Sequence, residues 1–126
     1  MATKQSDRVL AWAWAASLAI TAGLMLRPMP DLANDLTSLY PRSDLVFHFG
    51  LFLYLRILPH ATVWGRTRTA GISIALVGLG FALESAQSLT GTRTASCADA
   101  LANTAGVFVG SYLGPLLEEV RGKHDR

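Results

Sequence analysis

The 126-residue sequence is poor in charged residues and almost without cysteine. Only 16% of its residues are charged, and the formal net charge is +2. So small a positive excess does not favour a nucleic-acid-binding surface, which is strongly basic. The lone cysteine, Cys97, cannot form an internal disulfide and is expected to pack as a small apolar residue. The sequence also contains no HExxH pair of metal ligands.

Apolar residues make up 51% of the chain, and its mean hydropathy of +0.33 is high for a soluble domain of this size. The run over residues 9–26 contains no charged residue and, at about 1.5 Å per residue, covers roughly the hydrocarbon thickness of a bilayer. A basic segment precedes it, as in a signal peptide, but the run is longer than usual for one, which favours a membrane anchor. The other candidate spans are residues 41–58, 69–89 and 97–117.

These runs predict an all-α protein, a single domain over residues 1–126 in which a bundle of four helices spans the membrane. The second span is the least apolar, because Asp44, His48 and Arg56 interrupt it. Arg56 lies near the end of this span, where a long side chain is expected to snorkel to the lipid head groups.

The distribution of basic residues predicts the orientation of the bundle. Cytoplasmic loops of membrane proteins collect lysine and arginine. The amino terminus, the second connection and the carboxyl tail together hold eight of the eleven lysines and arginines, whereas the first and third connections hold three. Both termini are therefore predicted to face the cytoplasm, with Arg56 acting as a topology determinant.

Three of the predicted spans carry pairs of polar residues spaced by three or four positions, so that both members of a pair lie on one helix face. In the predicted orientation all three pairs lie in the outer third of the membrane, and the loop between the last two spans adds an arginine. We therefore expect one polar cluster near the outer face. Its expected members are Asp44, His48, Glu84, Gln87, Arg93, Asp99 and Asn103.

A stripe of glycines continues the last of these pairs along the same helix face. Gly106, Gly110 and Gly114 form a GxxxGxxxG pattern. Small residues at this spacing let a neighbouring helix approach closely. The stripe is therefore expected to pack inside the bundle and to direct Asp99 and Asn103 inward.

Three ordered motifs within residues 43–114 resemble the VanZ-like family of small bacterial membrane proteins. The motifs are Asp44-Leu-Val-Phe-His48-Phe49, Glu84-x-x-Gln87 and Arg93-x-x-Ser96-x-x-Asp99-x-x-x-Asn103-x-x-Gly106. The resemblance implies a small multi-pass protein of the bacterial inner membrane. The family's namesake is associated with teicoplanin resistance, which the resemblance implies as a candidate role. The chain departs from the family pattern at Leu45, where a basic residue is common, and at residues 90–93, which replace a Pro-Gly-Arg turn with Thr-Gly-Thr-Arg.

Two kinds of function fit the expected cluster. In the first, Arg93 binds a carboxylate or phosphate, and the other members bind the polar head of an envelope lipid, a peptidoglycan precursor or a glycopeptide. In the second, His48 and the carboxylates catalyse a transfer or hydrolysis at the membrane surface. We favour binding, with modulation of envelope interactions or low-level teicoplanin resistance as the role, because no nucleophile motif accompanies the cluster.

A third interpretation is structural. The polar groups would then only pair with one another and hold the helices of this chain together, and the protein would serve as a structural or assembly partner through helix contacts alone. No cofactor is expected. No metal is expected either, because one histidine beside carboxylates, without a second ligand at helical spacing, is weak support for a metal site.

Overall fold

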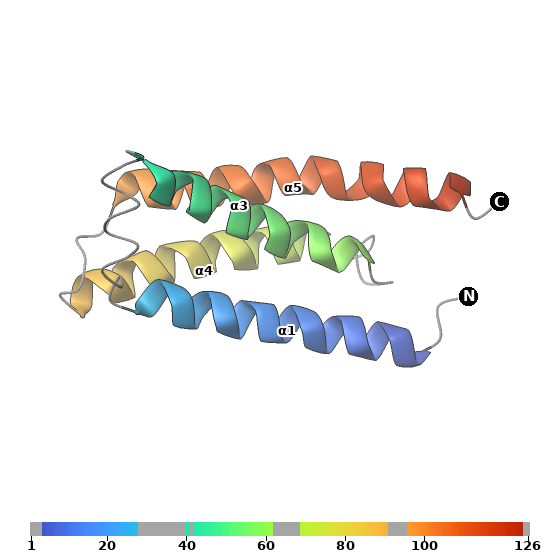
Figure 1. Ribbon diagram of the computed structural model, residues 1–126, viewed down its shortest axis with the longest axis horizontal. Coiled ribbons are helices and arrows are strands. Elements are labelled where there is room, and N and C mark those ends of the chain that lie inside the picture. The colour runs from blue at the N-terminus through green and yellow to red at the C-terminus, as the bar shows by residue number, and fades with distance from the viewer. Residues whose placement is uncertain (1–3, 28–39, 41, 62–68, 91–95, 125–126) are drawn as a thin grey trace.

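The computed structural model describes residues 4–27, 40, 42–61, 69–90 and 96–124, and every regular element in these ranges is helical. The elements are α1 (Lys4–Leu26), α3 (Ser43–Ile57), the 3-10 turn η1 (Leu58–Ala61), α4 (Thr69–Leu89) and α5 (Cys97–His124). The all-α prediction is confirmed for this part of the chain. The helices run alternately in opposite directions, so the start of α1 and the end of α5 lie at the same end of the bundle (Figure 1).

Three of the described helices are long and apolar enough to cross a membrane. They are Gln5–Leu26, Thr69–Leu89 and Cys97–Val120. The helix in the predicted second span, α3, is not among them, because its 15 residues cover only about 22 Å. It ends early because Pro59 has no N–H to donate to the carbonyl of Leu55, and the chain continues as the 3-10 turn η1.

The large apolar side chains lie mostly on the outside of the bundle. Trp12, Ile74, Leu89 and Phe108 are each more than half exposed. The buried residues, in contrast, include several polar and charged side chains. This distribution suits a lipid environment, in which exposed apolar side chains are well solvated and polar groups are more stable inside the bundle. Together with the three apolar helices, it indicates a multi-pass protein embedded in a membrane.

The most extensive helix contact, between α3 and α5, follows the glycine stripe. A Cβ added at Gly106 would lie 2.9 Å from the backbone nitrogen of Leu53, and one at Gly110 would lie 2.8 Å from Cβ of Arg56. At neither position does α5 have room for a side chain larger than that of glycine. The stripe therefore brings the backbone of α5 directly against α3.

An apolar core fills the space between the helices beside this contact. Phe52 and Leu55 of α3 are fully buried in it. Its other buried members are Met25, Leu76, Leu83 and Val107. The core draws residues from all four long helices and so fixes their mutual positions near the polar side chains described below.

Candidate functional site

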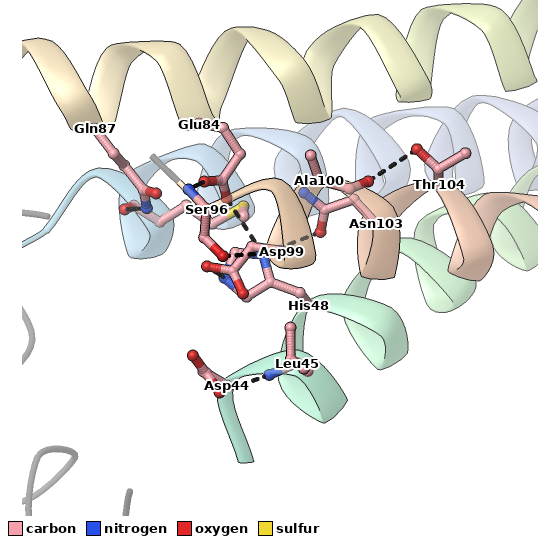
Figure 2. Close-up of polar contacts among 11 residues, drawn as sticks. Asp44, Leu45, His48, Glu84, Gln87, Ser96, Asp99, Ala100, Asn103 and Thr104 are labelled. Atoms are coloured by element: carbon pink, nitrogen blue, oxygen red, sulfur yellow. Dashed lines mark hydrogen bonds and ion pairs between the residues drawn. The ribbon is translucent and has the colours of Figure 1, made fainter. Parts of the chain in front are cut away.

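A polar cluster forms around the imidazole of His48, which lies in the second turn of α3 and is only 2% exposed. Its Nδ1 lies 3.0 Å from Oδ1 of Asn103 on α5. The same Nδ1 is 3.7 Å from Oε1 of Glu84 on α4, and Nε2 is 3.9 Å from Oδ2 of Asp99 on α5. Figure 2 shows these side chains converging from three helices. We call His48, Glu84, Asp99 and Asn103 the His48 cluster.

Helix spacing and small neighbouring residues explain this convergence. Asp99 and Asn103 are one turn apart, and both continue the face of α5 that carries the glycine stripe. Asn103 packs against Gly80 of α4, where an added Cβ would lie 3.2 Å from Cβ of Asn103. Because Gly80 lets α4 approach so closely, Glu84, one turn further along α4, reaches His48.

Two hydrogen bonds to backbone N–H groups fix the Glu84 carboxylate and the first turn of α5. Oε2 of Glu84 accepts a hydrogen bond of 3.3 Å from the backbone N–H of Ser96. The hydroxyl oxygen of Ser96 in turn accepts one of 3.3 Å from the backbone N–H of Asp99. Ser96 thus caps the start of α5, as serine commonly does before a first helical turn. Glu84 thereby connects the last turns of α4 to the beginning of α5.

The His48 cluster contains more hydrogen-bonding capacity than the described residues satisfy. Oε1 of Glu84, Oδ1 of Asp99 and Nδ2 of Asn103 are buried and have no hydrogen-bond partner among those residues. A buried polar atom without a partner costs about 1–3 kcal/mol. The His48 ring also lies within 4 Å of both carboxylates. The cluster therefore favours a ligand that brings hydrogen-bond donors or positive charge.

Two of the described predicted members, Asp44 and Gln87, are not part of this cluster. Asp44 is half-buried, accepts a hydrogen bond of 3.0 Å from the backbone N–H of Leu45, and lies apart from the cluster in Figure 2. Gln87 is buried, but its side-chain amide donates to the carbonyl of Met25. Carbonyls in the last turn of a helix lack an intrahelical partner, so Gln87 joins α4 to the end of α1. Arg93 lies outside the described residues.

A second group of buried polar side chains, which the sequence analysis missed, lies about two turns further along α3. Arg56 is only 1% exposed, so the expectation that it snorkels to the head groups is wrong. Its Nε donates to the hydroxyl of Ser73 at 2.8 Å, and one terminal nitrogen lies 2.7 Å from Nε2 of His60. Nδ1 of His60 is 3.2 Å from Oε1 of Glu118. We call these four residues the Arg56 network.

A sequence signal for the Arg56 network does exist. Arg56 and His60 are one turn apart, and Glu118 lies one turn beyond Gly114, at the same spacing as the glycine stripe. A Cβ at Gly114 would overlap the ring of His60. The position that continues the four-residue spacing of the glycine stripe is Glu118. The sequence could therefore have predicted a carboxylate beside Arg56 and His60.

The His48 cluster also contains residue types that bind metal ions. One ligand atom from each of His48, Glu84 and Asp99 lies within 4.8 Å of the other two. Imidazole nitrogen and carboxylate oxygen are common ligands of divalent transition metals. The sequence placed these three residues in one expected cluster but did not favour a metal there, because a single histidine stands beside carboxylates without a second ligand at helical spacing.

Comparison with known proteins does not add an identification. No protein-family model matches the sequence, and no curated protein and no solved structure matches it either. Function is therefore inferred from the side chains of the His48 cluster and from the motif resemblance.

Proposed function

We propose that this protein is a VanZ-like, four-span protein of the bacterial inner membrane, with both termini in the cytoplasm and the His48 cluster near the outer face. The alternating helix directions support a common side for the start of α1 and the end of α5 (Figure 1). The distribution of lysine and arginine supports the cytoplasm as that side. At about 1.5 Å per α-helical residue and about 2.0 Å per 3-10 residue, α3 and η1 together cover about 30 Å, which supports a fourth span.

The proposed role is binding of a polar group at the His48 cluster, either the head of an envelope lipid or peptidoglycan precursor, or a glycopeptide of the teicoplanin type. One observation carries this proposal: the buried Oε1 of Glu84 and Oδ1 of Asp99 have no hydrogen-bond donor among the described residues. Ammonium, amide and hydroxyl groups of such ligands donate hydrogen bonds that carboxylates accept. Nδ2 of Asn103 is a donor for an oxygen of the same ligand. Binding of this kind would modulate envelope interactions and give low-level resistance.

Catalysis on an envelope lipid or peptidoglycan precursor is the second candidate. The position of His48 between two carboxylates favours it, because an imidazole in such surroundings is suited to proton transfer. The two candidates differ in their response to loss of one carboxylate. A binding protein keeps part of its effect, since its other contacts remain, whereas an enzyme loses turnover sharply.

The proposal is tested by measuring teicoplanin susceptibility in cells that carry the wild type, no protein, or Glu84→Gln. Membrane abundance is measured in the same cultures. The wild type should protect the cells, and Glu84→Gln should protect them less at equal abundance, because an amide is a weaker acceptor than a carboxylate and carries no charge.

The matched control is Glu119→Gln, which makes the same substitution at an exposed position of α5. It should protect the cells as well as the wild type does. Cells that are equally susceptible with and without the wild-type protein would refute the resistance role. Equal protection by Glu84→Gln and the wild type would refute the role of the His48 cluster.

A further inference from the structure

Two buried carboxylates flank His48, and the ion pairs within the described part of the chain bring no lysine or arginine to either of them. Glu84 and Asp99 bring two carboxylates into one buried cluster. Buried charge is costly without an opposite charge. A divalent cation balances two carboxylates completely. We therefore infer that the His48 cluster binds one divalent transition-metal ion through His48, Glu84 and Asp99.

The distances in the cluster suit ligands that share an ion better than ligands that bond one another. Nε2 of His48 is 3.9 Å from Asp99, and Nδ1 is 3.7 Å from Glu84, which are both too long for hydrogen bonds. Metal–ligand distances of about 2.0–2.2 Å place two ligands of one ion roughly 3–4 Å apart, and the distance from Nε2 to Asp99 fits this spacing. The three ligand atoms already lie within 4.8 Å of one another.

Asn103 orients the imidazole for this task. Its Oδ1 only accepts hydrogen bonds, so the His48 Nδ1 at 3.0 Å carries the proton and Nε2 has a lone pair for the metal. A metal-binding histidine almost always donates its second N–H to an oxygen, which fixes the ring and the tautomer. Asn103 is therefore a positioning residue and not a ligand.

The ligand set favours zinc or manganese. Imidazole is a good ligand for zinc, and carboxylates suit both zinc and manganese, whereas calcium and magnesium prefer oxygen ligands throughout. Three side chains leave at least one coordination position for an oxygen of a bound envelope group. The inference rests on the proposed binding role of the His48 cluster and deepens it by naming how the ligand is held.

The test uses the full chain, purified in detergent with an affinity tag that contains no histidine. The protein is stripped with EDTA and titrated separately with Zn²⁺ and Mn²⁺, and bound metal is counted by mass spectrometry. We expect about one ion per chain for the wild type. His48→Gln and Asp99→Asn should bind at least tenfold more weakly, and Asn103→Leu about 10–100-fold more weakly because the ring loses its orientation.

Glu119→Gln is the matched control and should bind as the wild type does. Helix content is measured for every protein to identify variants that fail to fold. Such a variant does not decide whether the metal site exists, because the number of ions bound per wild-type chain already tests it. A folded wild type that binds neither ion specifically would overturn the inference. Wild-type affinity in folded His48→Gln and Asp99→Asn would also overturn it.

The outcome is separate from that of the susceptibility experiment. A wild type that binds one ion per chain but does not protect cells from teicoplanin would support the metal site and refute the resistance role. A wild type that protects cells but binds no ion would refute the metal site alone.

Discussion

The indole N–H of Trp14 on α1 donates a hydrogen bond of 2.9 Å to the carbonyl of Leu55 on α3. In a continuous α-helix this carbonyl would accept from the residue four positions later, which here is Pro59 and has no N–H. The indole therefore supplies the bond that the proline removes. It also joins α1 to α3 at the point where the α-helix ends and η1 begins.

Trp14→Phe should destabilise the bundle by about 1 kcal/mol, because it keeps an aromatic ring but leaves the Leu55 carbonyl without this donor. The free energy of unfolding, measured by titrating purified protein from mild detergent into SDS, checks this value. Trp12→Phe is the control, since Trp12 is 76% exposed. Equal stability of the two variants would show that the bond to Leu55 contributes nothing.

Gly106→Ala should lower the amount of protein that accumulates in the membrane. Its new Cβ would meet the backbone of α3, 2.9 Å from the nitrogen of Leu53, where only movement of a whole helix makes room. Gly78→Ala is the control, because a Cβ at Gly78 has nothing within 4 Å. Immunoblots of membrane fractions compare the variants. Normal accumulation of Gly106→Ala would contradict close packing of α3 on α5.

Arg56→Lys should destabilise the protein by about 1–3 kcal/mol, although it preserves the charge. The guanidinium donates to Ser73 from one nitrogen and contacts His60 from another, and a single ammonium cannot reproduce this fork. Arg8→Lys makes the same change at an exposed position and should have little effect. Unfolding titrations decide the matter, and equal stability of the two variants would mean that the Arg56 network does not depend on the guanidinium.

Spacing along the chain predicted which faces of the helices are polar and that three of them meet, but not which neighbour each polar side chain contacts. The four-residue spacing of Asp99 and Asn103 and the glycine stripe placed both residues on an inward face of α5 before any partner was known. The same reasoning assigned Gln87 to the cluster, whereas its amide bonds to the carbonyl of Met25. The spacing of Gln87 along α4 does not distinguish a side chain that faces the His48 cluster from one that faces α1. The sequence also does not show that α1 ends beside Gln87.

Arg56 shows a second limit of the sequence argument. An arginine near the end of an apolar run usually reaches the head groups, and that rule was applied here. Pro59 instead turns the chain so that His60 comes back beside Arg56, and the glycine stripe brings Glu118 within reach of His60. The partners of Arg56 thus come from η1, from Ser73 of α4 and, through His60, from Glu118 of α5, so local hydropathy does not predict its burial.

On the proposed function, the His48 cluster is a binding site and not a link that holds the helices together. Glu84→Gln tests this role most directly. The amide keeps the shape of the side chain and an oxygen that accepts from the Ser96 N–H, but it removes the carboxylate beside Asp99. The measurement is the free energy of unfolding of the metal-free protein. Glu118→Gln is the comparison: loss of the Glu118 charge should weaken its bond to His60 and lower stability by about 0.5–1 kcal/mol.

For a site built to receive a ligand, removal of the buried charge should leave the free energy of unfolding unchanged or raise it by about 1–2 kcal/mol, since such sites sacrifice stability for function. If Glu84→Gln lowers the free energy of unfolding as much as Glu118→Gln does, the Glu84 carboxylate holds the bundle together. That result would contradict a binding role for the His48 cluster.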